Sequence, residues 1–385
     1  MRLLYAFPEP LPLERARGIQ TVHTVAALAA QGIDMTLAHV PSSADPFAAY
    51  SVAIPGKVRL LPVSRSLPWP FARMHSNRLF AARLAKRIDP GEIGAVMARH
   101  LKASALLLER IPGLRLLYEA HEVFADTAPP RRRKDTERLE RAVVKGVAAL
   151  VANSNATAAR LRALYEITAP IEVIPNGVEY PESVPAKDWA RASERIVYAG
   201  SFFSWKGVDD LVDAARALPG LCIRLIGGSE ARIAQLRARA GSAGASLDFA
   251  GHIPHGRVAA ELARACIAVL PNRADPDSAF TSPIKLFEYM AAGCALVVSD
   301  LPSLREVLGQ DDAVWTAPGD AAGLASAIRT LAEDPERARR LGARVREKAR
   351  SYTWAARGER LARIVRPLLE QRQPVRAPGH EAPER

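Results

Sequence analysis

Two short segments of the chain combine side chains that suit a phosphorylated ligand. In one of them, the loop Thr281–Pro283 precedes a predicted helix, Ile284–Ala292, with a hydroxyl at the N-cap and proline at the first helical position. Ser282, Lys285 and Glu288 recur every third residue on one side of its first two turns. Helix amides, a hydroxyl and a lysine suit a phosphate, and the carboxylate suits ribose hydroxyls. In isolation, the pattern favours a capped helix with a solvated Lys–Glu pair.

The second segment, Tyr198–Ala215, changes that balance. A predicted strand runs into Gly200 and Ser201, and the following loop carries Lys206 just before a helix that starts near Val208. Glycine lets the backbone turn tightly and approach a ligand, and a lysine beside a helix N-terminus again suits a phosphate. The chain has 44 Arg and 9 Lys, so lysine at both 206 and 285 indicates that the amine itself matters.

Two features of the first half are weaker candidates. His121 follows the predicted strand Leu114–Glu119, at the edge where an open parallel sheet places its site, and it could bond a substrate hydroxyl. The alternative is a loop histidine held by neighbouring backbone. The loop Pro8–Gln20, after the first strand, carries three residues that could cradle a phosphate or admit a sugar, namely Arg15, Arg17 and Gly18.

The elements that position these residues alternate between short apolar runs and amphipathic helices, which favours parallel sheets covered by helices on both faces. The pattern restarts near Ile196, after a polar stretch, so the sequence predicts two doubly wound α/β halves with a boundary near 176–195 and a site in the cleft between them. The predicted strands are Arg2–Phe7, Ile33–His39, Val58–Val63, Ala95–Arg99, Leu114–Glu119, Ala148–Ala152, Glu172–Ile174, Ile196–Ser201, Cys222–Gly227, Leu247–Ala250, Ile267–Leu270, Ala295–Ser299 and Ala313–Thr316.

Composition excludes several classes of protein. A chain of 385 residues, 49% hydrophobic and 24% charged, is long enough for two globular cores. Its three cysteines stand far apart, which argues against a zinc site or a disulfide scaffold. The dinucleotide GxGxxG, P-loop and HExxH motifs are absent. The N-terminus does not read as a signal peptide and no apolar run reaches the length of a membrane span, so we expect a cytoplasmic protein.

Charge is unevenly distributed along the chain. Residues 1–175 hold 24 basic against 15 acidic residues, 176–320 hold 14 against 18, and 321–385 hold 15 against 8, within a net charge of +12. Basic surface attracts lipid or nucleotide phosphate. The run Arg131–Lys134 is the best candidate for contact with an anionic membrane, although a solvated helix start explains it equally well. The basic residues lack interleaved aromatics, which argues against nucleic acid.

The motifs together resemble those of the retaining glycosyltransferases of family 4, the group 1 glycosyl transferases. In chain order they are the glycine loop after the first strand, YEAHE from Tyr118, PNGVE from Pro175, YAGSFFSWKG from Tyr198 and TSPIKLFEYMAAG from Thr281. The resemblance implies a GT-B fold, with two Rossmann-like domains facing across a cleft. It implies an acceptor-side domain at 1–178, a nucleotide-sugar domain at 179–350 and a helix crossing back at 351–370. Residues 371–385 are polar and rich in proline, which predicts a disordered tail.

The resemblance also implies roles for residues. Lys206 would contact the donor pyrophosphate and Glu288 the ribose hydroxyls, while His121 would lie near the donor sugar. The segment Gly251–Ile253 would contact the base through its backbone. The other implied donor contacts are Gly18, Gly200, Ser201, Thr281, Ser282, Pro283, Ile284 and Lys285. Such enzymes need no metal, so we expect neither a metal nor a cofactor beyond the nucleotide-sugar co-substrate.

Two positions depart from the family pattern. Phe280 stands where many members have a glutamate, and Ser201 where many have an arginine. Contacts to the sugar would then come from the Thr281–Lys285 loop, and Lys285 or Arg17 would supply the second phosphate cation. These departures concern the identity of the donor more than the type of reaction.

The expected function is transfer of a sugar, with retention of configuration, from a nucleotide-diphosphate sugar to a saccharide or lipid-linked acceptor, in polysaccharide or glycolipid synthesis. A location on the inner face of the cytoplasmic membrane would suit the basic first half. The alternatives are a sugar-nucleotide epimerase or phosphorylase on the same scaffold, and a non-catalytic nucleotide-sugar or polysaccharide-binding protein.

Overall fold

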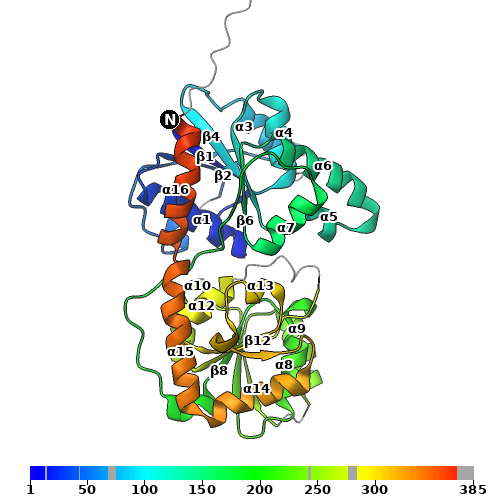
Figure 1. The fold of residues 1–385 in the computed structure, drawn as a ribbon, viewed down its shortest axis with the longest axis vertical. Helices are drawn as coiled ribbons and strands as arrows, with labels where there is room; N and C mark the ends of the chain where they lie inside the picture. The colour runs from blue at the N-terminus through cyan, green and yellow to red at the C-terminus, as the bar shows by residue number, and fades with distance from the viewer. Residues whose placement is uncertain (14, 43, 68–74, 242–243, 276–283, 371–385) are drawn as a thin grey trace, which may run out of the picture.

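The computed structural model describes residues 1–385 except 14, 43, 68–74, 242–243, 276–283 and 371–385. The described chain forms two parallel sheets, each covered by helices (Figure 1). The first sheet has the order β3-β2-β1-β4-β5-β6-β7 and the second the order β10-β9-β8-β11-β12-β13. The strands are β1 Arg2–Pro10, β2 Met35–Val40, β3 Val58–Pro62, β4 Ile93–Ala98, β5 Leu116–Ala120, β6 Ala149–Ala152, β7 Ile171–Val173, β8 Ile196–Ala199, β9 Cys222–Ile226, β10 Ser246–Gly251, β11 Ile267–Leu270, β12 Ala295–Ser299 and β13 Val314–Thr316.

All thirteen predicted strands are confirmed in the described residues, with ends that differ by no more than about three residues. The inner strands β4, β5, β6, β8, β11 and β12 are buried along their whole length, as parallel strands under two helical layers require, whereas the edge strands β3, β7 and β10 are partly exposed. The helices are α1 Ala16–Ala30, α2 Pro46–Ala49, α3 Asn77–Ala85, α4 Leu101–Arg110, α5 Phe124–Thr127, α6 Arg133–Gly146, α7 Asn155–Leu164, α8 Val208–Ala215, α9 Glu230–Ala240, α10 His255–Arg264, α12 Ile284–Ala291, α13 Pro302–Arg305, α14 Ala321–Glu333, α15 Pro335–Ala349 and α16 Trp354–Glu370. Short 3₁₀ turns include η3 Ser204–Lys206 and η5 Arg350–Tyr352.

The chain crosses between the two halves twice. The first sheet ends at Val173 and the second begins at Ile196. After α15 packs on the second half, η5 leads into α16, which returns to the first half (Figure 1). Its buried face joins the core that contains Leu3 and Tyr5. The predicted tail at 371–385 lies outside the described residues.

The two segments that cross between the halves pack closely against each other. Val178 forms a bridge with Thr353, and the ring of Trp354 stacks on His23 of α1, with centroids 4.8 Å apart. A Cβ on Gly177 would lie 2.5 Å from the Trp354 ring, so the packing there requires glycine. This contact fixes where α16 enters the first half.

Candidate active site

The helix α12 is anchored to the end of β8 by one tyrosine. The buried hydroxyl of Tyr289 accepts a hydrogen bond from Ala199 N (2.7 Å) and donates one to Ala199 O (3.1 Å). Lys285 and Glu288, one turn apart on the same helix, contact each other at 3.1 Å, with 29% and 13% of their side chains exposed. The helix that carries both candidate residues is therefore tied to the carboxyl end of β8, and the two side chains form the Lys–Glu pair that the sequence left open.

The loop after β8 brings Lys206 to the start of α8. Gly207, at the N-cap of α8, has φ +69°, and a Cβ there would lie 1.8 Å from the carbonyl oxygen of Pro271. Arg273 N also donates to Trp205 O, so the loop packs closely on the end of β11. The ammonium group of Lys206 lies over the Trp205 ring, 3.8 Å from its centroid. The turn thus holds a cation beside the positive end of a helix, an arrangement that attracts anions.

Two carboxylates follow in the first turn of α8, and both are paired with arginine. Asp209 contacts Arg232 at 2.5 Å, and Asp210 contacts the Nε and terminal nitrogens of Arg273 at 2.7 and 2.5 Å. Because Arg232 and Arg273 neutralise these two carboxylates, the carboxylates do not offset the positive charge of Lys206.

The sequence prediction missed a glycine pair next to this loop. Gly227, at the end of β9, has φ +118°, and a Cβ there would lie 2.0 Å from the carbonyl oxygen of Gly200. Gly227 N donates to Gly251 O, so the predicted base-contacting segment Gly251–Ile253 adjoins the same edge of the sheet. The doublet Gly227-Gly228 after a predicted strand was the available signal.

The structure describes only some of the other predicted residues. Thr281, Ser282, Pro283 and the family position Phe280 lie outside the described residues. The side chain of Ser201 is exposed, while its carbonyl oxygen accepts a hydrogen bond from Tyr198. Ile284 is buried at the start of α12.

Two of the three candidates in the first loop, Arg17 and Gly18, have close neighbours within the chain. Arg17 is paired with Glu9 at 2.7 Å, so its charge is already used within the loop. A Cβ on Gly18 would lie 2.6 Å from the Tyr50 hydroxyl and 2.8 Å from Leu13 O, which accounts for glycine without a ligand. Arg15 is exposed at the N-cap of α1.

His121 belongs to a buried polar cluster at the carboxyl end of β5. Its Nε2 lies 3.2 Å from Oε1 of Glu119, without the alignment of a hydrogen bond. Glu119 accepts hydrogen bonds from Tyr5 (2.7 Å), Gln20 (2.6 Å) and Arg357 of α16. Arg99, just after β4, donates to Gln20 Oε1 at 2.7 Å. The sequence prediction singled out His121 alone and missed its buried partners.

The cluster keeps His121 uncharged at neutral pH. Burial, together with the positive charge of Arg99, lowers the pKa of His121 to about 4, although Glu119 acts in the opposite direction. Burial alone would raise the pKa of Glu119, but its contacts with His121 and Arg357 hold that pKa below its usual range. A neutral imidazole can donate or accept a hydrogen bond from a sugar hydroxyl.

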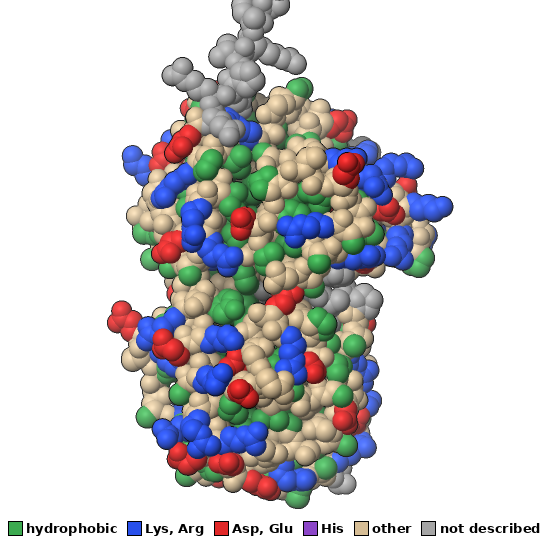
Figure 2. Space-filling view, in the orientation of Figure 1, with side chains coloured by type: hydrophobic (Ala, Val, Ile, Leu, Met, Phe, Trp, Pro, Cys, Tyr) green, Lys and Arg blue, Asp and Glu red, His purple; other side chains and the backbone are tan. Residues whose placement is uncertain are grey.

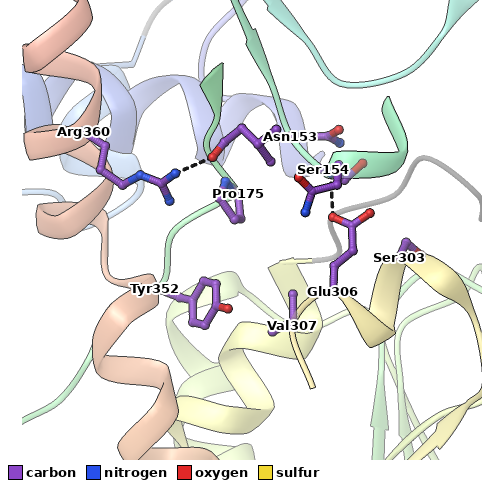
Figure 3. A pocket seen from close by; sticks show the side chains of 10 residues that line it. Asn153, Ser154, Pro175, Ser303, Glu306, Val307, Tyr352 and Arg360 are labelled. Atoms are coloured by element: carbon purple, nitrogen blue, oxygen red, sulfur yellow. Dashed lines mark hydrogen bonds between the residues drawn. The ribbon is translucent and has the colours of Figure 1, made fainter. Parts of the chain in front are cut away.

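A pocket of about 280 Å³ lies between the two halves, near His121 (Figure 3). Asn153, one of its lining residues, donates from Nδ2 to the carbonyl oxygen of His121 at 2.9 Å. Across the pocket, the Glu306 carboxylate accepts hydrogen bonds from Asn155 N and Ala156 N at the start of α7, at 2.6 and 2.8 Å. This carboxylate from the second half caps a helix of the first half. The full lining is Asn153, Ser154, Asn155, Val173, Pro175, Ser303, Glu306, Val307, Tyr352 and Arg360.

Known proteins match both halves. The family model "Glycosyltransferase Family 4" matches residues 18–180, and "Glycosyl transferases group 1" matches residues 193–334. Glycogen synthase of Mycobacterium tuberculosis is 31% identical over 235 residues, covering 54% of each chain. Phosphatidyl-myo-inositol mannosyltransferase of Mycolicibacterium smegmatis is 29% identical over 200 residues, covering 50% of each. The matched region thus spans about half the length of these relatives.

The fold has counterparts among solved structures. HepE of Anabaena, in complex with UDP and glucose, superposes with a TM-score of 0.74 at 15% sequence identity, covering 95% of this chain and 99% of that one. At this identity the likeness concerns the fold, which is GT-B: two parallel-sheet domains with helices. With family models matching both halves in order, this chain belongs to the group 1 glycosyl transferases of family 4.

Proposed function

We propose that the protein transfers a sugar from a nucleotide-diphosphate sugar to an acceptor hydroxyl, with retention of anomeric configuration, and that it needs no metal ion. The observations that support the proposal are that Lys206 lies in the loop that follows β8, and that α12, which carries the Lys285–Glu288 pair, is hydrogen-bonded through Tyr289 to Ala199 at the end of β8. In open α/β sheets, nucleotides bind at this edge.

In this reaction the departing nucleotide diphosphate gains negative charge. Lys206 and the amides at the start of α8 would stabilise that charge in the transition state, where such interactions contribute most to rate. Glu288 would bind the ribose and fix the donor. Neutral His121, across the cleft, would hydrogen-bond the sugar that is transferred. The acceptor hydroxyl then attacks on the face that the leaving diphosphate departs from, and the diphosphate takes its proton.

The test is release of nucleoside diphosphate from a panel of UDP-, GDP- and ADP-sugars, with a crude lipid extract as acceptor. The proposal predicts release from one donor, with equal rates in the presence and absence of EDTA. Absence of release from every donor, together with absence of saturable donor binding, would reject it. Donor binding without release would favour the binding-protein alternative.

Replacement of Glu288 by glutamine should raise the KM for the donor by about tenfold or more, with a smaller change in kcat. A hydrogen bond to a charged group contributes about 1.5–3 kcal/mol, and the amide still fills the space of the carboxylate. Steady-state kinetics with the accepted donor measures this effect.

Glu336 offers a matched control. It forms an i,i+3 pair with Arg339 on α15, as Glu288 does with Lys285 on α12. If Glu288 is only half of a solvated helix pair, E288Q and E336Q will have equal and negligible effects on KM, and the role in ribose binding is wrong.

We also propose that the acceptor-side half binds an anionic membrane surface through Arg131–Lys134. In the described residues no helix has the length and apolarity to cross a membrane. All four side chains are exposed at the start of α6, and Figure 2 shows Lys and Arg side chains gathered on this outer end of the first half. Each basic residue near such a surface contributes about 1 kcal/mol.

Replacement of Arg131, Arg132 and Lys134 by glutamine should therefore weaken binding to vesicles with anionic lipid about tenfold or more, while binding to neutral vesicles stays negligible. Arg133 is left in place because it contacts Asp126 at 3.2 Å. Sedimentation with vesicles of phosphatidylcholine, with and without phosphatidylglycerol, measures the effect. Equal sedimentation of the variant and the wild type would refute the assignment of this patch.

A further inference from the structure

We propose that Arg357, on the C-terminal helix α16, is a positioning residue for His121 and acts through the carboxylate of Glu119. The inference rests on the proposed function only in giving His121 a part in sugar transfer. The arrangement of the three side chains itself is independent of the substrate.

The pair of Arg357 and Glu119 is almost completely buried, with 2% and 1% of the side chains exposed. Burying two charges is costly unless hydrogen bonds satisfy both groups. Arg357 meets this condition, because it also donates to the carbonyl oxygens of Ile174 (2.8 Å) and Pro175 (2.6 Å). Its Nη1 is thus held by backbone of the segment that links the two halves, its Nε donates to Thr24 Oγ1, and its Nη2 donates to Glu119.

The contacts on Glu119 are divided between its two oxygens. Oε2 accepts from the Tyr5 hydroxyl, whereas Oε1 accepts from Gln20 and Arg357. Oε1 is also the oxygen that lies 3.2 Å from Nε2 of His121. A carboxylate beside Nε2 favours the tautomer with its hydrogen on Nε2, and leaves a lone pair on Nδ1. Glu119 therefore selects the tautomer, and Arg357 keeps Glu119 ionised and in place.

The charged groups around His121 explain why Arg357 also contributes to its protonation. They are Arg99, just after β4, Glu119 on β5 and Arg357 on α16, while the uncharged Tyr5 of β1 contacts Glu119. With two arginines beside one carboxylate, a further positive charge on His121 is unfavourable. Without Arg357, the Glu119–His121 pair would take up a proton at higher pH.

The experiment is nitrogen NMR of the full chain labelled with ¹⁵N-histidine, comparing the wild type with R357Q. In the wild type, His121 should show the Nε2–H tautomer and stay neutral down to about pH 4. In R357Q, its midpoint should rise above that of the wild type, because one of the two arginines that disfavour the charged imidazole is gone. H121N identifies the signal, and R357K, which restores a cation, should move the midpoint back.

Arg360, one turn further along α16, provides the matched control. It donates to the carbonyl oxygen of Val173, and so also joins α16 to the segment between the halves, but it does not contact Glu119. R360Q should leave the titration of His121 unchanged. The proposal is overturned if His121 titrates identically in R357Q and the wild type, or if R360Q moves its midpoint as far as R357Q does.

R357Q leaves a buried carboxylate without its main partner and could prevent folding, so a double variant is needed. E119Q/R357Q removes both charges. In this variant His121 should lose its fixed tautomer, and a retained single Nε2–H tautomer would overturn the proposal. In transfer assays, R357Q should lower kcat with the donor KM unchanged. If no chain catalyses transfer while the NMR changes occur as expected, the proposed function is wrong and the positioning of His121 stands.

Discussion

Replacement of Lys206 by alanine is expected to lower kcat/KM for the donor by about 100- to 1,000-fold, the usual effect of removing one preorganised group that stabilises a developing anion. That loss corresponds to about 3–4 kcal/mol in the transition state. The ammonium group lies over the Trp205 ring, and losing this contact costs only about 0.5–1 kcal/mol of folding stability. K206A should therefore remain folded while its catalysis is almost abolished.

Release of nucleoside diphosphate at subsaturating donor measures this effect. K57A is the matched control, because Lys57 is an exposed lysine of the first half, outside the site. K206R, which keeps a positive charge in a different shape, should retain part of the activity. Activity of K206A within about twofold of wild type would show that Lys206 has no part in stabilising the leaving group.

Replacement of Gly207 by alanine should destabilise the second half by about 3 kcal/mol or more. The left-handed conformation, φ +69°, costs a non-glycine residue about 1–2 kcal/mol. The added Cβ would also lie 1.8 Å from Pro271 O, so the backbone must shift. Substitutions that force such a clash are among those with the largest effects on stability. Because Gly207 joins Lys206 to α8, donor binding should weaken as well.

Gly220 separates the two contributions. It lies in the same half with φ +80°, but nothing lies within 4 Å of the position that its Cβ would take. G220A should therefore cost only the conformational part, about 1–2 kcal/mol. Urea unfolding of both variants, followed by a probe in the second half, gives the two free energies. Equal losses would show that the loop yields easily and that the close approach to Pro271 has no energetic weight.

The inner strands were predictable because most of them are short apolar runs between polar loops. Ala295–Ser299 shows the reason: its residues are buried on both faces, and Gly293 with φ +68° ends the preceding helix. Strand ends were harder to predict. The structure extends β1 to Pro10, past Pro8, whereas the apolar pattern of the sequence stops at Phe7.

The candidate site of the second half came from contiguous motifs. Gly200, Lys206 and Glu288 needed only local spacing and the rule that sites form at the carboxyl ends of strands. The loop after β1 was harder to interpret, because a glycine admits a ligand and a close packing partner equally well. There, Gly18 packs against Tyr50.

The residues that the sequence prediction missed act through partners far away in the chain. Glu306 caps α7 across about 150 residues, and Arg357 contacts Glu119 across 238. No local pattern encodes such pairs. For Arg357 there was one signal: it falls on the apolar stripe of α16 formed by Trp354, Leu361 and Val365. A charged residue on a buried stripe requires a buried partner.

The most direct test of the account is proton NMR of the anomeric signals while the protein acts on its donor and acceptor. The account predicts that the phosphorus-coupled anomeric doublet of the sugar nucleotide disappears, and that a new glycoside signal of the same anomeric configuration replaces it. A product of opposite configuration would contradict retention. Conversion of the donor into another sugar nucleotide without acceptor would contradict glycosyl transfer itself.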